Sequence, residues 1–312
     1  MKYINLNSAK NILLTGSDGA LGKELIKVLS KRKIKFINTS KSPDNMYFLD
    51  ILDYERIKYF LDTYKPDIII HLAAIVPIPI VEKNQNFAFN VNVIGLNNVF
   101  KAVEESKIKS KIIVVSSSEV YGNGKLNRKF TESDSFSPNN FYAFTKVAQE
   151  ELSQIYLKRG LQIVIARIFN YSSIFKKPIY SLESFANQIA KIIHTNSERI
   201  LEVGNLIPKR DFLQGQDVAL ALIRIIERSE ENNVFNISRG QANSMENLLQ
   251  KMIKLFKIDL DITVNSKLLR NVENIYVCGD NTKLTSLGWE PSFTEDEMIS
   301  VLVEYYKNIY RI

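Results

Sequence analysis

The chain has 312 residues, of which 45% are hydrophobic and 24% charged, a composition typical of a globular protein with a substantial core. Its net charge of +7 is spread over lysines and arginines that alternate with acidic residues, so it favours a small anionic ligand over nucleic acid. One cysteine and two histidines exclude an intrachain disulfide and a Cys/His metal cluster, so we expect no metal.

The apolar stretches reach only about five to six residues, whereas a membrane-spanning helix needs roughly 20. Residues 1–10 are polar and lack the apolar core of a signal peptide. We therefore expect a cytoplasmic protein with no membrane partner.

The first half of the chain alternates short apolar runs with helical periodicity. Strands are expected at 11–15, 34–38, 67–71, 111–116 and 162–167; helices are expected at 20–31, 54–63, 87–106 and 141–159. Continuous apolar strands separated by helices indicate a parallel sheet that is covered on both faces. Because such crossovers are right-handed, the predicted fold class is α/β with a doubly wound parallel sheet.

The pattern becomes less regular after residue 170. A loop is expected at 171–180, an irregular segment at 200–215 and a strand at 234–238; helices are expected at 181–194, 216–229, 244–256 and 294–308. We therefore predict a sheet domain at 1–170 and a smaller mixed α/β lobe at 171–312. No linker separates the two, so some exchange of strands and helices between them is expected.

Three glycines follow the first strand in the pattern G-x-x-G-x-x-G. Gly16 would permit the tight turn, Gly19 would let a pyrophosphate approach the backbone, and Gly22 would let helix and strand pack closely. The helix N-terminus would hold the phosphates, with Ala20 and Leu21 beside them. At a strand–helix junction this pattern predicts a dinucleotide site, although a simple tight turn is the alternative.

The end of the second strand bears on which dinucleotide is bound. An acid there would bind the ribose 2′-hydroxyl, but the chain has hydroxyls and a cation, including Ser40 and Lys41. This favours NADP(H) over NAD(H); a solvated lysine-rich loop is the alternative. Asp50 and Ile51, shortly before the helix expected at 54–63, are expected to meet the adenine, although Asp50 could instead cap that helix.

Tyr142 and Lys146 stand four residues apart in an expected helix, on one face. A nearby ammonium favours phenolate, so this pairing predicts a lowered tyrosine pKa and a group able to transfer a proton. The pair follows Ser117, which ends a strand at the carboxyl edge of the predicted sheet, where α/β folds bind ligands.

The glycine turn, SSSEVYG at 116–122, YAFTK at 142–146 and RIFN at 167–170 together resemble the extended short-chain dehydrogenase/reductases that act on nucleotide sugars. The resemblance covers essentially the whole chain and implies a Rossmann fold. It implies that Ser117 bonds the sugar oxygen, that Tyr142 is the acid/base, and that Lys146 binds the nicotinamide ribose. Further implied cofactor contacts are Leu72, Ala73, Ala74, Asn92 and Val115.

The second lobe resembles GDP-mannose 4,6-dehydratases and GDP-4-keto-6-deoxy-mannose reductases around residues 203–212 and 270–289. This implies substrate contacts from Asn170, Arg210, Arg270 and Glu273, with the arginines holding a diphosphate by paired hydrogen bonds. Alternatives are a structural Arg–Asp pair for Arg210 and a solvated charge for Arg270 and for Glu273.

The favoured reaction is NADPH-dependent reduction of the C4 keto group of a GDP-linked 4-keto-6-deoxy sugar, as used in surface-polysaccharide synthesis. A 4,6-dehydratase remains open, because Glu119 could remove the C5 proton and Ser118 stands where the acid would act. A 4-epimerase and a catalytically silent dinucleotide-binding protein also remain open.

A homodimer is expected as well, because members of this family commonly pair the two helices that correspond to 92–106 and 142–158. Phe144, Leu152, Ile155 and Tyr156 are apolar enough to form such an interface, although they could equally face the chain's own core.

Overall fold

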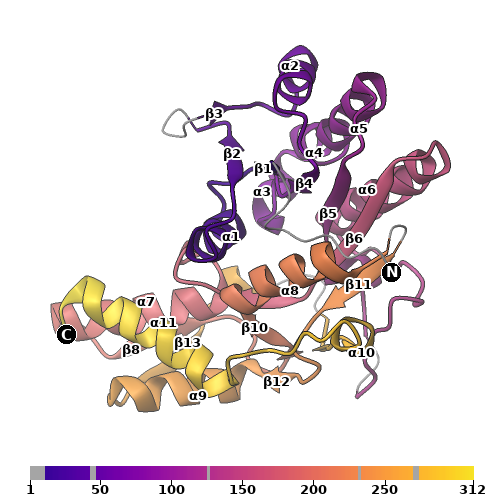
Figure 1. The fold of residues 1–312 in the computed structure, drawn as a ribbon. Helices are drawn as coiled ribbons and strands as arrows, with labels where there is room; N and C mark the ends of the chain where they lie inside the picture. Colours follow the sequence, from indigo (N-terminus) through magenta and orange to yellow (C-terminus); the bar gives the residue numbers. More distant parts are fainter. Residues whose placement is uncertain (1–10, 43–46, 125–126, 231–232, 270–273) are drawn as a thin grey trace.

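The computed structural model describes residues 11–42, 47–124, 127–230, 233–269 and 274–312. Its centre is a seven-stranded sheet in the order β11-β6-β5-β4-β1-β2-β3, with every neighbouring pair parallel (Figure 1). The strands are β1 (Ile12–Thr15), β2 (Phe36–Ser40), β3 (Tyr47–Phe48), β4 (Ile68–His71), β5 (Lys111–Ser117), β6 (Gln162–Ile168) and β11 (Val234–Ile237). The expected doubly wound α/β fold is confirmed.

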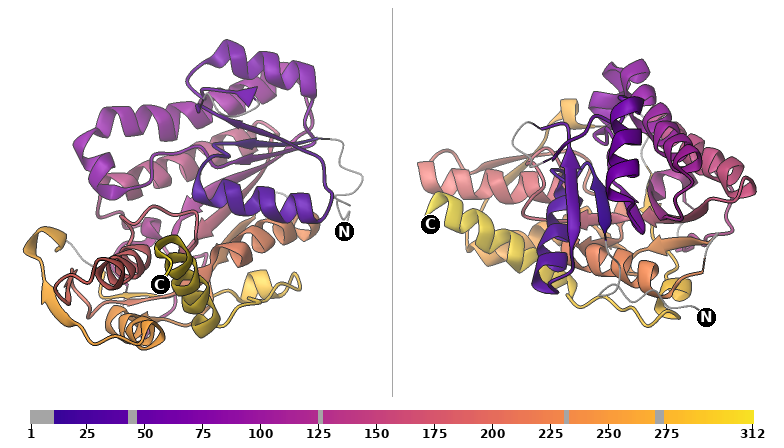
Figure 2. Two further views of the ribbon diagram at one scale, coloured as in Figure 1. Left: turned by 90° about the vertical axis from the view of Figure 1, so that its left-hand side faces the viewer. Right: turned by 45° about the horizontal axis from the view of Figure 1, so that its top comes forward.

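Helices cover both faces of this sheet (Figure 2). One face carries α1 (Ala20–Lys31) and α8 (Gly215–Arg228), whose buried leucines and isoleucines share a core with alternate strand residues. The other face carries α2 (Tyr54–Tyr64), α5 (Gly95–Ser106) and α6 (Phe141–Lys158) over a second core. In the described part of the chain, no helix combines the length and apolarity needed to cross a membrane.

A smaller group of elements lies beside the carboxyl edge of the sheet. The helices α7 (Ser181–Thr195), α9 (Met245–Phe256) and α11 (Glu295–Tyr310) share a core with β8 (Ile200–Val203) and β10 (Phe212–Gln214). Short elements complete it, namely β7 (Asn170–Ser172), β9 (Lys209–Arg210), β12 (Asn243–Ser244), β13 (Asp261–Val264), β14 (Tyr276–Val277), η3 (Ser266–Leu268) and α10 (Thr282–Thr285). Because β11 and α8 belong to the sheet layer, that layer draws on both halves of the chain.

Several expected boundaries were wrong. The second strand begins two residues later and continues to Ser40, because its pairing with β1 extends to Thr15–Thr39. The helix expected at 87–106 begins earlier, as α4 (Gln85–Phe89) after α3 (Ile78–Lys83), and contains a π-helical turn, η1 (Asn90–Ile94), before α5. The segments 171–180 and 200–215 contain short strands, which are too brief to produce a readable periodicity.

Candidate active site

The candidate site lies at the carboxyl edge of the parallel sheet, between the neighbouring strands β1 and β4. The chain continues from β1 to β2 on one side of this point and from β4 to β5 on the other. In open α/β sheets this reversal of strand order leaves a crevice that binds ligands. The glycine turn follows β1, residues 72–74 follow β4, and Ser117 ends β5. The topology therefore brings the expected cofactor and catalytic residues to one edge.

The geometry of the glycine turn fits a pyrophosphate. Gly16 has φ +66°, and a Cβ there would lie 2.6 Å from the Cα of Ala73; a Cβ at Gly22 would lie 2.4 Å from the carbonyl oxygen of Ser17. Around Gly19, by contrast, the nearest atom to an added Cβ is the Gly16 oxygen at 3.3 Å. Gly19 is the N-cap of α1, whose first turn has no acid, so this helix end suits an anion.

Two buried polar atoms face this edge without a hydrogen-bond partner among the described residues, Ser17 Oγ and His71 Nε2. His71 Nδ1 lies 3.0 Å from Thr15 Oγ1, and burial lowers the pKa of His71 to about 3, which keeps the ring neutral. Buried polar atoms normally find partners, so these two support a bound polar ligand. His71 had no assigned role in the sequence, because one histidine in an apolar strand is usually structural.

The residues expected around the rest of the dinucleotide line the same edge. Leu72, Ala73 and Ala74 are half-buried, and the Leu72 N–H donates to Thr15 O at 3.2 Å. Asn92 is fully buried in η1, where its side chain exchanges two hydrogen bonds with the Ile75 backbone at 2.7 and 3.1 Å.

At the expected ribose end, Lys41 and Asp50 form an ion pair of 2.9 Å. Ser40 Oγ accepts from the Ser42 N–H at 3.0 Å. The alternative role of Asp50 as a helix cap was wrong, because Asp53 caps α2 by accepting from the Arg56 N–H at 3.0 Å. Ile51 is buried. The sequence has no acid immediately before Lys41, but in the structure Asp50 contacts Lys41 from the segment that follows β3.

The two hydroxyls expected to be catalytic come from β5 and α6. Tyr142 lies in the first turn of α6, where the nearby side chain of Ser117 acts on its phenol and partly offsets the rise in the Tyr142 pKa. Ser117 Oγ also accepts from the Glu119 N–H at 3.2 Å, at the start of the 3₁₀ helix η2 (Ser118–Tyr121). Asn140 caps α6 by accepting from the Ala143 N–H at 2.8 Å, which fixes where the helix begins.

Lys146 is buried one turn further along α6. Its Nζ donates to Val115 O at 2.8 Å and to Gln149 Oε1 at 2.9 Å, and it lies 5.9 Å from the centre of the Tyr142 ring. Burial lowers the pKa of Lys146 to about 8. The expected lowering of the Tyr142 pKa by Lys146 was wrong for this structure: burial raises it, because removing phenolate from water dominates.

Glu119, the candidate base of the alternative dehydratase reaction, lies beside this pair. Glu119 Oε2 accepts from Asn140 Nδ2 at 3.1 Å, and the Glu119 charge is near enough to raise the Tyr142 pKa further. Ser118 is buried at the start of η2. Asn140 was missed in the sequence as a site residue, although an asparagine just before a helix is a recognisable cap.

The expected substrate residues are spread over the smaller group of elements. Asn170 begins β7, directly after β6, and Arg210 lies in β9 between β12 and β14, with its Nη1 donating to Lys209 O at 3.0 Å. Arg270 and Glu273 lie outside the described residues. Asp211, next to Arg210, is fully buried and accepts from the N–H groups of Arg239 at 2.7 Å and Gly240 at 2.8 Å.

Comparison with known proteins decides the family. The family described as GDP-mannose 4,6 dehydratase matches residues 13–302. The chain belongs to this family. It is an extended short-chain dehydrogenase/reductase, as the sequence motifs implied.

Individual relatives are distant but cover most of the chain. A GDP-6-deoxy-D-mannose reductase from Pseudomonas aeruginosa is 27% identical over 249 residues, which span 79% of this chain and 82% of the relative. A GDP-6-deoxy-D-talose 4-dehydrogenase from Aggregatibacter actinomycetemcomitans is 27% identical over 300 residues, spanning 95% and 97%. The solved structure of RMD from P. aeruginosa complexed with NADPH is 25% identical, with a TM-score of 0.87 and coverage of 96% and 99%.

In this extended short-chain dehydrogenase/reductase, the segment after Asn170 brings further side chains towards Tyr142. The Lys176 Nζ lies 4.2 Å from the ring centres of both Tyr171 and Tyr180 and donates to Tyr171 O at 2.7 Å. Tyr180 is close enough to contribute to the raised Tyr142 pKa. Sequence reasoning missed these residues because they lie in a segment without periodicity.

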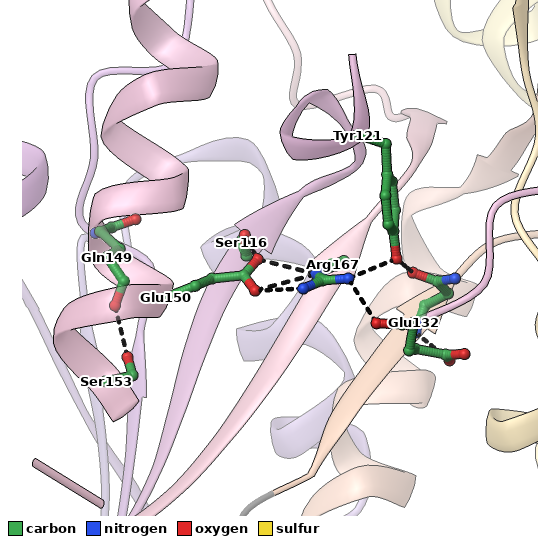
Figure 3. A network of polar contacts seen from close by, with 8 residues as sticks. Ser116, Tyr121, Glu132, Gln149, Glu150, Ser153 and Arg167 are labelled. Atoms are coloured by element: carbon green, nitrogen blue, oxygen red, sulfur yellow. Dashed lines mark hydrogen bonds and ion pairs between the residues drawn. The ribbon is translucent and has the colours of Figure 1, made fainter. Parts of the chain in front are cut away.

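A buried polar network supports α6 from the side of β6 (Figure 3). Arg167 donates to both carboxylate oxygens of Glu150, at 2.7 to 3.1 Å, and to the Tyr121 hydroxyl at 2.9 Å. Ser116 also donates to Glu150. The network ties α6, and with it Tyr142 and Lys146, to the strands that end at the site.

Proposed function

We propose that the chain is a reductase that uses NADPH to reduce the C4 keto group of a GDP-linked 4-keto-6-deoxy sugar. The closeness of Tyr142 and Ser117, with Lys146 buried one turn away, is the observation that carries this proposal. Two hydroxyls held together at the carboxyl edge of the sheet can contact the same sugar oxygen.

In the proposed reaction the sugar ketone becomes an alcohol. Bound NADPH would supply the hydride that adds to C4 and would leave as NADP⁺. Ser117 would donate a hydrogen bond to the carbonyl oxygen, and Tyr142 would give its proton to that oxygen as negative charge develops. The raised pKa of Tyr142 keeps the phenol protonated before the reaction, which suits a proton donor.

The choice of NADPH rests on Ser40 and Lys41 at the end of β2. The Lys41 side chain is 65% exposed and can reach a 2′-phosphate, but its ammonium already forms an ion pair with Asp50 at 2.9 Å. The complex of RMD with NADPH supports the same choice, because that structure covers almost the whole chain. Residues 16, 19–22, 50–51, 72–74, 92 and 115 are proposed to hold the rest of the dinucleotide.

The proposed GDP-linked substrate rests on the relatives, two of which are named for GDP-6-deoxy sugars. Asn170 and Arg210 are the described side chains proposed to contact the diphosphate, and Arg270 and Glu273 are proposed with them. The net charge of +7 favours such an anionic substrate.

A 4,6-dehydratase is the second candidate, and the position of Glu119 favours it. Its carboxylate is fixed by Asn140 beside Tyr142, where a base for the C5 proton would be needed. Dehydration needs no net consumption of NADPH, since hydride removed early in the reaction is returned later. A 4-epimerase would also conserve the cofactor.

The decisive experiment incubates the purified protein with a panel of GDP-, UDP- and dTDP-linked hexoses and their 4-keto-6-deoxy derivatives, once with NADPH and once with NADP⁺ or NAD⁺, which a dehydratase or epimerase needs to accept the first hydride. A reductase oxidises one NADPH for each sugar and yields a product heavier by two hydrogens. Loss of water from a hexose at constant NADPH absorbance would instead identify a dehydratase, and a product of unchanged mass an epimerase. No turnover of any sugar, together with normal dinucleotide binding, would indicate a silent binding protein.

We also propose that the protein is a homodimer formed through α5 and α6. Phe144 and Ile155 of α6 are 46% and 50% exposed, and Phe87 and Ile94, just before α5, are 48% and 40% exposed. Exposed apolar side chains that gather on one face mark an association surface, which is the role proposed for these four. Tyr156, which the sequence offered for this face, lies instead in the core against Phe100, and Leu152 packs partly against the same core.

A further inference from the structure

We propose that Gln149 is a positioning residue that holds the ammonium of Lys146 in place by linking it to the backbone of η1. The inference rests on the role proposed for Lys146 at the nicotinamide ribose and adds a residue to that site. Gln149 lies three residues after Lys146 on α6 and is completely buried.

The side chain of Gln149 uses both ends of its amide. Its Oε1 accepts from Lys146 Nζ at 2.9 Å, and its Nε2 donates to Asn92 O at 2.5 Å. The donor contact fixes the orientation of the amide, so that the oxygen faces the lysine. Gln149 therefore presents an acceptor whose position is set by η1 rather than by α6 alone.

The η1 end of this link is itself held firmly. The Asn92 side chain donates to Thr145 Oγ1 at 3.0 Å and to Ile75 O at 3.1 Å, and it accepts from the Ile75 N–H. Asn92 and Thr145 are both 0% exposed. Single π-helical turns such as η1 are often found at functional sites, because they shift one backbone segment relative to the helix.

The hydrogen bond from Lys146 to Gln149 matters because Lys146 is buried and has few other acceptors. An ammonium has three N–H donors, and among the described residues Val115 O and Gln149 Oε1 take two of them. One donor then remains for a hydroxyl of a bound ligand. Without the Gln149 oxygen, the buried charge would be less stabilised, and the ammonium would have a wider range of positions.

The charged and titratable groups around Lys146 come from several elements. On α6 these are Tyr142, whose pKa burial raises, and Glu150, whose carboxylate is paired with Arg167 of β6. His71 on β4 has its pKa lowered to about 3, and Glu119 of η2 acts on Tyr142. The pKa of Lys146 is lowered to about 8 by burial, so Lys146 is the group of this set expected to titrate between pH 7 and 9.

The test measures NADH binding by fluorescence from pH 6 to 10 in the full-length protein and two variants. NADH is chosen because it lacks the 2′-phosphate, whose own titration near pH 6 would overlap. Loss of affinity at high pH reports deprotonation of Lys146. Gln149→Met keeps the length of the side chain but removes the acceptor for Lys146. The pH at which half of the NADH affinity is lost (the midpoint) should therefore move down by about one pH unit. Gln149→Glu keeps an acceptor and adds negative charge, so the midpoint should move up by a similar amount.

Ser153→Ala is the matched control. Ser153 is also completely buried on α6, and its hydroxyl donates to Gln149 O at 2.7 Å (Figure 3). Among the described residues, no hydrogen bond joins the Ser153 side chain to Lys146. This variant should lower the melting temperature without moving the binding midpoint. Opposite shifts for Gln149→Met and Gln149→Glu support the proposal; midpoints that stay at the wild-type pH in both variants overturn it. If one variant does not fold, the other decides.

The same data separate this inference from the proposed reaction. NADH binding requires no sugar, so a protein that reduces no 4-keto sugar but shows the opposite shifts keeps the Gln149 inference and loses the reductase. A protein that reduces the sugar with unshifted midpoints loses only the inference. Where turnover is found, Gln149→Met should lower kcat about ten-fold, while Ser153→Ala stays within two-fold of wild type.

Discussion

Arg167 on β6 donates hydrogen bonds from both Nε and Nη2 to the Glu150 carboxylate on α6, and the two side chains are only 5% and 2% exposed (Figure 3). A buried charge that loses its partner is costly, because neither water nor another ion replaces the contact. Arg167→Met is therefore expected to lower the free energy of unfolding by about 3–5 kcal/mol in urea denaturation.

The surface pair Arg128–Asp134 provides the control for this prediction, since the Arg128 side chain is half exposed. Arg128→Met should cost less than about 1 kcal/mol. The double variant Arg167→Met/Glu150→Met should recover part of the loss of the single variant, because no unpaired charge remains. Equal costs for the buried and exposed single variants would contradict the assignment of Arg167.

The hydroxyl of Tyr142 is expected to carry the proton transfer. Tyr142→Phe removes the proton donor beside Ser117, so kcat should fall by about 10²–10⁴-fold while NADPH affinity changes little. Tyr156→Phe is the control on the same helix, because it removes a hydroxyl that bonds Asn97 at 3.1 Å away from the site. Steady-state kinetics with the substrate found in the panel measure both, and similar losses in the two variants would refute the role of Tyr142.

The ion pair between Lys41 and Asp50 should set the preference between the two dinucleotides. Lys41→Asp removes the cation proposed for the 2′-phosphate and adds repulsion, so NADPH affinity should fall about ten-fold or more relative to NADH. Asp50→Asn releases Lys41 and should improve NADPH binding by a few-fold. Lys254→Asp on α9 controls for net charge, and an unchanged NADPH/NADH ratio in Lys41→Asp would remove the basis for the NADPH assignment.

The backbone at Gly19 is less crowded than at Gly16 and Gly22, which predicts a variant that loses binding but keeps the fold. In Gly19→Ala the new methyl group would lie 3.3 Å from Gly16 O, a tight contact that a shift of a few tenths of an ångström relieves, so the melting temperature should fall much less than in Gly22→Ala. The same methyl group would occupy the surface proposed for the pyrophosphate, so dinucleotide affinity should fall at least about ten-fold. Gly22→Ala is the contrast, because its Cβ would lie 2.4 Å from Ser17 O and should destabilise the protein itself.

The proposed dimer is tested by Phe144→Glu. A charge placed among exposed apolar side chains should shift the sedimentation coefficient from that of a dimer to that of a monomer, with the far-UV spectrum unchanged. Ile309→Glu on α11 serves as the control, because Ile309 is similarly exposed, at 51%, in the smaller group of elements. A wild-type protein that sediments as a monomer at micromolar concentration would remove this proposal.

Sequence patterns alone were enough to predict the central strands of the sheet and most of its helices, but they assigned the strand at 234–238 to the smaller lobe and gave no range for β3. Helix α1 has the expected bounds, and its inward positions, such as Leu25 and Leu29, are buried because apolar residues recur at helical spacing. The glycine turn and the YAFTK segment were also readable, because their chemistry depends on residues close together in the chain. Short strands such as β7 and β9 were not, because two or three residues carry no periodic signal.

The tertiary structure decided how distant residues act on one another. Local spacing alone predicted that Lys146 would lower the Tyr142 pKa, but burial of the phenol beneath other elements has the larger effect and raises it. Lys41 and Asp50 are nine positions apart and become an ion pair only because β2 and β3 lie side by side. Gln149 likewise contacts Asn92 only because α6 packs against η1. The sequence specifies which side chains are present, but packing of the helices decides which acceptor faces which charge.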